Sequence, residues 1–125
     1  MKFFNLILLL FCLSSAQANN IYKKIETLSS KVEKSVVKWR RHIHQNPELS
    51  NREFMTAKYV ADHLRSLGIE IKEKVAHTGV VGIIKGGKPG PVVALRADMD
   101  ALPVTERVDI PFASKVTTIY KDVEV

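Results

Sequence analysis

Residues Val92–Glu106 read Val-Val-Ala-Leu-Arg-Ala-Asp-Met-Asp-Ala-Leu-Pro-Val-Thr-Glu, an apolar run that ends in two carboxylates, Asp98 and Asp100. Continuous apolar runs of this kind are typical of strands buried on both faces. Because side chains two apart on a strand share a face, both carboxylates are expected to point the same way from the strand end. Open α/β sheets bind ligands outside the carboxyl ends of their strands, so this is the predicted place for chemistry. Considered alone, the spacing fits a helix cap or a solvated loop acid equally well.

The segments on either side of this run predict more strands. Gly79–Lys85 is a second apolar strand, and the turn sequence Gly86–Gly90 predicts an antiparallel hairpin between it and Pro91–Arg96. Ile69–Lys74 alternates apolar and charged residues, which is typical of a half-exposed edge strand. Weaker strand signals lie at Val104–Ile110 and Val116–Tyr120, the latter followed by a predicted turn at Lys121-Asp122.

Two amphipathic helices are predicted before these strands. The first runs from about Ile21 to His44 and stops before Pro47, because a residue that precedes proline is disfavoured in helical conformation. The second opens at Ser50-Asn51-Arg52-Glu53, which has capping-box spacing, and ends at Gly68. The predicted fold class is therefore α/β, a mixed sheet with flanking helices. The apolar stripe of the first helix, which also resembles a coiled-coil seam, is Ile21, Ile25, Leu28, Val32, Val36, Trp39 and Ile43; the predicted buried face of the second is Phe54, Ala57, Val60, Ala61, Leu64 and Leu67.

Residues 1–18 have the three parts of a secretory signal peptide. A basic start, Met1-Lys2, precedes the apolar run Phe3–Leu13, and Ala16-Gln17-Ala18 is a small-residue cleavage site. A membrane span needs about 20 apolar residues, so an anchor is the weaker interpretation, as is a buried N-terminal helix. Residues 19–125 are then the mature segment, exported to the periplasm or the extracellular space. The only cysteine, Cys12, lies within the signal peptide, so no disulfide or thiolate ligand is expected in the mature segment.

The charged residues do not point to nucleic acid. The net charge is +6, or +5 without Lys2 of the signal peptide, and it is spread along helix faces with no dense arginine patch. His42 and His44 lie two apart on a predicted helix and face different sides, which is poor spacing for a shared metal ion. His44 is instead predicted to bond the last-turn carbonyls or its neighbours, and Glu53 is assigned to the capping box.

Several motifs nevertheless occur together in a specific order. They are Arg40-Arg41-x-x-His44-x-x-Pro47-Glu48-Leu49, then Glu53, Thr78-Gly79-Val80, Leu95-Arg96-Ala97-Asp98-Met99-Asp100-Ala101-Leu102-Pro103 and Ile110-Pro111-Phe112-Ala113-Ser114. Together they resemble the N-terminal part of the zinc-peptidase-like, metal-dependent N-acyl amino acid amidohydrolases: hippurate hydrolase, the aminoacylases and the plant indole-acetyl-amino-acid hydrolases. The resemblance covers about Ile21 to Val125, so it assigns residues 19–125 to the N-terminal portion of an amidohydrolase catalytic domain.

This resemblance implies a chemistry and a site. It implies an α/β domain that holds two divalent metal ions, such as zinc or manganese, and a smaller inserted domain that helps to form a homodimer. The implied reaction is hydrolysis of the amide of a small N-acyl amino acid by metal-activated water, with a glutamate that shuttles the proton. By position, Asp100 matches the aspartate that supports a metal-binding histidine. Asp98 takes the place of a ligand histidine found in related peptidases and is not assigned as a ligand.

The resemblance also implies what these 125 residues lack. In the family, a His-Ala-Cys-Gly-His-Asp segment with metal ligands follows the equivalent of Val125, and it is missing here. Zinc sites use three or four protein ligands, so the segment alone is expected to bind no catalytic metal and to hydrolyse nothing. The alternative is a short secreted binding or interaction module, or a decayed remnant, that uses the apolar stripe of the first helix to contact a partner.

Overall fold

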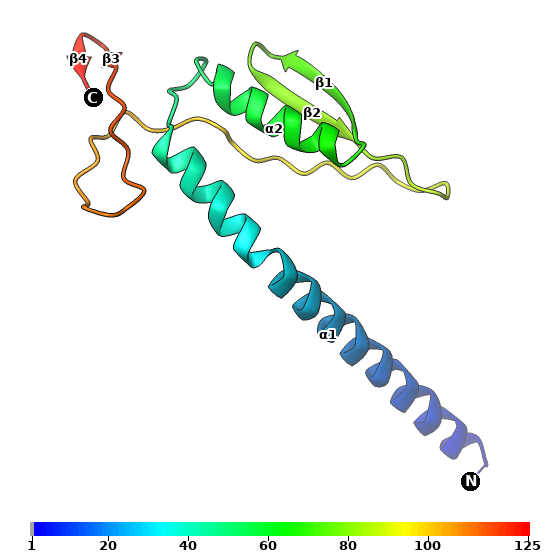
Figure 1. Cartoon of the computed structure of the whole chain (residues 1–125). Helices are drawn as coiled ribbons and strands as arrows, with labels where there is room; N and C mark the ends of the chain where they lie inside the picture. The colour runs from blue at the N-terminus through cyan, green and yellow to red at the C-terminus, as the bar shows by residue number, and fades with distance from the viewer. Residues whose placement is uncertain (1) are drawn as a thin grey trace. The chain divides into compact units, whose positions relative to one another are not determined.

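A computed structural model describes the backbone of residues 2–125 and the side chains of residues 20–125 (Figure 1). The chain divides into two compact units, the first extending to Arg40 and the second formed by Arg41–Val125. Helices and small sheets together give the predicted α/β class. The elements in chain order are α1 (Lys2–Gln45), α2 (Phe54–Ser66), β1 (Glu70–Val75), β2 (Gly79–Ile83), β3 (Ile119–Tyr120) and β4 (Val123–Glu124).

The first helix ends where the sequence predicts and begins earlier. α1 stops at Gln45, two residues before Pro47, but it begins at Lys2 rather than near Ile21. No helix in the described part of the chain is long and apolar enough to cross a membrane. The predicted signal peptide, residues 1–18, lies outside the residues whose side chains are described. Side chains of the predicted stripe that are exposed are Ile21, Ile25, Leu28, Val32 and Val36.

A glutamate outside the helix caps the start of α2. The Glu48 carboxylate accepts hydrogen bonds from the backbone N–H groups of Met55 and Thr56, at 3.1 and 2.7 Å, and from the Thr56 hydroxyl at 2.8 Å. A negative charge here stabilises a helix because the first N–H groups have no partner within it. The predicted capping box is therefore wrong: α2 begins at Phe54, and its N-cap residue, Glu53, makes no side-chain cap.

The end of α2 confirms the prediction at Gly68. This glycine has a φ of +72°, and its N–H donates to the Arg65 carbonyl at 2.9 Å. The Ile69 N–H then donates to the Leu64 carbonyl at 3.2 Å, which completes a Schellman motif. The chain is thereby reversed, and the first strand is directed back along the helix.

The hairpin of the structure is not the predicted one. β1 pairs antiparallel with β2, with Glu70 opposite Ile83, through a tight turn in which Ala76 and His77 have positive φ. α2 packs against both strands (Figure 1). β1 is largely exposed, as expected of an edge strand. Pro91–Arg96, the expected partner of β2, forms no strand. β2 pairs with β1 instead, and in the described chain no strand lies beside Pro91–Arg96 to pair with it.

The chain after β2 is largely irregular. Two apolar side chains of the predicted core strand, Val92 and Leu95, are 99% and 96% exposed. Val104–Ile110, a weaker strand candidate, is also irregular. Near the end of the chain, β3 and β4 form a second hairpin across the predicted Lys121-Asp122 turn, where both residues have positive φ.

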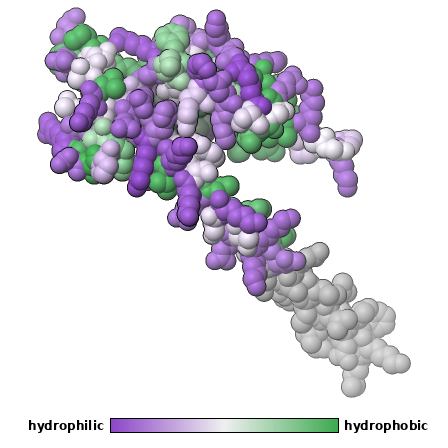
Figure 2. Space-filling model, viewed as in Figure 1, coloured by the Kyte–Doolittle hydropathy of each residue, from purple (hydrophilic) through white to green (hydrophobic). Residues whose placement is uncertain are grey.

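The core of the described residues is small. Leu49 and Ala61 are its buried hydrophobic side chains, and Phe54 and Leu67 of the predicted buried face are exposed. Figure 2 shows hydrophobic side chains at the surface among hydrophilic ones. The buried polar side chains are Glu53, Thr56 and Thr78.

Candidate functional site

A hollow of about 920 Å³ lies within residues 41–125, and Asp100 is in its wall. Its walls come from the last turn of α1, from the loop that leads to α2, and from residues 99–106 and 114–118. We call it the Asp100 hollow. The backbone fixes this wall at one point: the Ala101 N–H donates to the Glu48 carbonyl at 2.8 Å, and Ala101 forms a parallel bridge with Leu49.

The two aspartates of the DxD triplet have different surroundings. The Asp98 carboxylate pairs with the Arg96 guanidinium at 2.7 Å, and Asp98 does not line the hollow. Asp100 lines the hollow and is exposed, and its carboxylate has no hydrogen-bond or ion-pair partner among the described residues. The expected strand under them is absent, so the alternation of a strand does not hold both carboxylates on one face.

A second acidic group, which the sequence analysis missed, lies in the same hollow. The Glu106 carboxylate accepts a hydrogen bond from His44 Nε2 at 2.6 Å and another from the Val108 N–H at 3.1 Å. The hydrogen bond with His44 lowers the pKa of Glu106, and the Val108 N–H adds to this. Because 62 residues separate the pair, no local spacing pattern could have revealed it.

The two histidines near the end of α1 face different partners, as predicted. His42 stacks on Tyr59 of α2 with ring centroids 4.2 Å apart. His44, expected to bond nearby carbonyls, pairs instead with Glu106. His77 lies in the β1–β2 turn, with its ring edge-on to Phe54.

The donors around the hollow do not by themselves fit a metal ion. Within the described part of the chain, no three His, Cys, Asp or Glu side chains lie close enough to hold one. The oxygens of Glu48 cap α2, and His44 is held by Glu106. Asp100 is left as a single oxygen donor, whereas zinc sites use three or four protein ligands.

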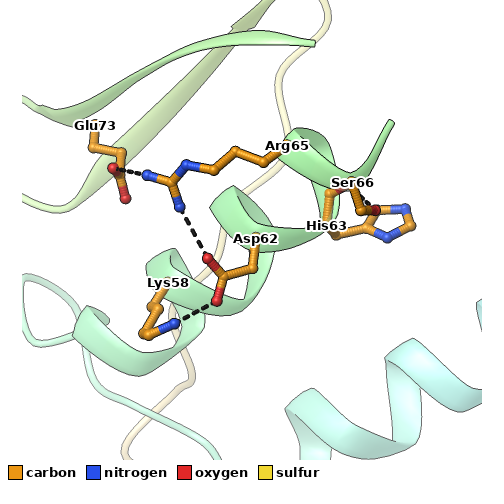
Figure 3. A network of polar contacts seen from close by, with 6 residues as sticks. All are labelled: Lys58, Asp62, His63, Arg65, Ser66 and Glu73. Atoms are coloured by element: carbon orange, nitrogen blue, oxygen red, sulfur yellow. Dashed lines mark hydrogen bonds and ion pairs between the residues drawn. The ribbon is translucent and has the colours of Figure 1, made fainter. Parts of the chain in front are cut away.

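A separate polar network joins α2 to β1 on the surface (Figure 3). Asp62 pairs with Lys58 and, at 2.9 Å, with Arg65, which also pairs with Glu73 of β1. The hydrogen bond from Lys58 is the main cause of a lowered pKa at Asp62. These ion pairs link α2 to β1. Each charged group in the network is exposed and already paired with an opposite charge, so none of the four is left for chemistry.

Curated proteins and a solved structure match this chain closely. The thermostable carboxypeptidase 2 of Saccharolobus solfataricus is 52% identical over 98 residues, which are 78% of this chain and 25% of that protein. The N-acyl-L-amino acid amidohydrolase of Geobacillus stearothermophilus is 44% identical over 93 residues, 74% of this chain and 25% of that protein. No protein-family model matches.

The solved structure decides the family. It is a Bacillus subtilis protein described as a dinuclear metal-binding peptidase of the M20 family, with a TM-score of 0.65 and 43% identity over 70% of this chain and 25% of that one. The chain belongs to the M20 family of peptidases and amidohydrolases. This confirms the resemblance and the α/β class, and it does not favour a binding module, since these M20 relatives are hydrolases. The chain spans about a quarter of the length of the relatives it matches.

Proposed function

We propose that the full-length protein is a metal-dependent amidohydrolase that hydrolyses N-acyl amino acids. The observation that carries the proposal is the 44% identity with an N-acyl-L-amino acid amidohydrolase, which covers three quarters of the chain. The chain contributes Asp100 and the segments that line the hollow with it, among them the last turn of α1 and the loop that leads to α2. The 125 residues alone are proposed to be inactive, because the donors among the described residues do not make up a metal site.

A second substrate class has its own support. A relative at 52% identity is a carboxypeptidase, an enzyme that removes the C-terminal residue of a peptide. Its scissile bond and that of an N-acyl amino acid are alike: in both, the amide nitrogen belongs to an amino acid with a free carboxylate. We therefore infer that this carboxylate, next to the amide, is the recognised feature. N-acyl amino acids are the first substrates to test and short peptides the second.

Asp100 is the proposed functional side chain of this segment. Asp100 lines the Asp100 hollow, and its carboxylate has no partner among the described residues, which fits a group that orients a histidine supplied elsewhere in the full-length protein. A dinuclear metal-binding relative supports a divalent metal, and we propose zinc or manganese. A homodimer is the proposed assembly, on the resemblance alone.

The experiment measures amino acid release from hippurate and other N-acyl amino acids by the full-length protein. We expect turnover with zinc or manganese, its loss on chelation, and its recovery when metal is restored. Asp100→Asn is expected to lower kcat about ten- to a hundredfold, the range typical for loss of a group that holds a metal ligand, whereas Asp98→Asn serves as the matched control. A protein that is folded and metal-loaded but cleaves neither N-acyl amino acids nor peptides would refute the proposal.

We also propose export, through cleavage after Ala18. The support is the basic start, apolar run and small-residue site of residues 1–18. Mass spectrometry of the N-terminus of the protein from its source should find Asn19 as the first residue. An N-terminus at Met1 in the mature protein would contradict this.

A further inference from the structure

The loop that follows Asp100 is fastened at both ends to one short segment. At its start, the Ala101 N–H donates to the Glu48 carbonyl at 2.8 Å. At its end, Glu106 pairs with His44 at 2.6 Å. Residues 101–106 are therefore attached at both ends to residues 44–48. Between the two attachments the loop turns at Pro103, where the Val104 N–H donates to the Leu102 carbonyl.

Both residues of the His44–Glu106 pair make further contacts. The Val108 N–H holds the second oxygen of Glu106, whose side chain is 19% exposed. On the other side, the His44 ring lies edge-on to Phe112 with centroids 5.8 Å apart, and the Arg41 guanidinium lies 4.6 Å from the Phe112 ring centroid. The end of α1 thus contacts Glu106 through His44, and Phe112 through both His44 and Arg41.

An ordinary surface ion pair contributes little to global stability. The His44–Glu106 pair matters instead for where the loop after Asp100 lies, because it attaches the far end of that loop to α1. Without it, the hydrogen bond at Ala101 would be the remaining polar attachment of the six-residue loop to residues 44–48 among the described contacts, and the loop could pivot about Ala101, directly beside Asp100. Catalytic groups depend on position, and a displacement of about 1 Å can cost a hundredfold in rate.

We propose that the His44–Glu106 pair is a positioning contact that holds Asp100 and its loop in the wall of the Asp100 hollow. His44 and Glu106 are positioning residues, since they act through the loop that carries Asp100. This inference rests on the proposed function for its effect on rate. Its structural part, the fastening of residues 101–106, stands independently of that function.

Hydrogen–deuterium exchange of the full-length protein tests the structural part. His44→Ala and Glu106→Ala are each expected to raise deuterium uptake in residues 101–106, with little change in β1 and β2. The double variant should show no more uptake than either single variant, because both remove the same contact. The matched control is His42→Ala, which lies on the same turn and loses only its stacking on Tyr59. Uptake in residues 101–106 that is equal in His44→Ala and His42→Ala would overturn the proposal.

Kinetics test the effect on the reaction. His44→Ala is expected to lower kcat about ten- to a hundredfold, the range that a small misplacement costs, and to leave KM and the melting temperature nearly unchanged. His44→Gln, which keeps an N–H donor, should recover much of the rate and also serves if the alanine variant fails to fold. A loss confined to KM, or no recovery with glutamine, would count against positioning. If the wild type is inactive while the exchange results hold, the proposed function fails and the fastening stands.

Discussion

At the scale of single residues, Glu53 is the buried charged residue of the described part of the chain and gives a prediction about acid stability. Its side chain, in a residue only 7% exposed, accepts hydrogen bonds from the Thr78 hydroxyl at 2.7 Å and from the Asn51 N–H at 2.9 Å. Burial raises the pKa of Glu53, but the hydrogen bonds from Thr78 and the backbone, with the nearby charge of His77, outweigh it and leave the pKa lowered. The folded state therefore favours the ionised carboxylate.

The stability that Glu53 contributes therefore depends on pH. Because the folded pKa is below the unfolded one, the stabilisation is complete above the usual glutamate pKa and is lost as the pH falls through the lowered value. Glu53→Gln should destabilise the full-length protein at pH 7 by about 1.5 to 3 kcal/mol, as for hydrogen bonds to a charged group. That difference should shrink toward pH 3 in urea unfolding experiments. Glu124→Gln, on the exposed strand β4, is the control. A wild-type-to-variant difference that stays constant from pH 7 to pH 3 would contradict the assignment.

At the scale of elements, the β1–β2 hairpin depends on Gly79. A Cβ built there would lie 2.5 Å from the Val75 carbonyl oxygen across the hairpin, and a backbone atom cannot move aside as a side chain can. Gly79→Ala is expected to destabilise the full-length protein by about 1 to 3 kcal/mol, the usual cost of overpacking. Gly87→Ala is the matched control, because a Cβ there meets no atom within 4 Å. Thermal melts of the two variants should separate them, and equal melting temperatures would refute the steric argument.

The elements also show what local sequence could and could not predict. Pro47 and Gly68 marked the ends of α1 and α2 because each acts through its own backbone geometry. Pairing partners were harder, since β2 had apolar segments on both sides and the periodicity of a strand does not say which neighbour it joins. The Gly-rich sequence Gly86–Gly90 suggested one hairpin, whereas the three-residue turn before Gly79 made the other.

The candidate site was predictable only in part for the same reason. Asp100 could be singled out because its local motif matches a family, and the structure places it in the wall of a hollow. The residues that contact this wall could not be predicted. Glu106 lies 62 residues from His44, and Glu48 forms hydrogen bonds through both its carbonyl and its carboxylate. Contacts of this kind depend on how the chain folds back, which composition and spacing do not encode.

At the scale of the whole molecule, the described residues expose much of their apolar surface. Leu49 and Ala61 are buried, whereas Ile84, Val92 and Leu95 are at least 80% exposed. Burial of apolar area is the main favourable term in folding, at about 25 cal/mol per Å². The matched segment is about a quarter of the length of each relative, and we propose that further chain in the full-length protein covers these side chains.

Residues 19–125 produced alone are therefore expected to aggregate or to stay loosely folded. Val92–Leu95 would present an unpaired apolar segment, and such segments associate between chains. Light scattering after size exclusion should report assemblies larger than a monomer, and a hydrophobic dye should bind much more per residue than to the full-length protein. Replacing Val92 and Leu95 with lysine should reduce the association, whereas replacing the already polar Lys88 and Arg107 with serine should not. A soluble monomer with one sharp cooperative melt would show that the exposed residues pack adequately by themselves, contrary to this expectation.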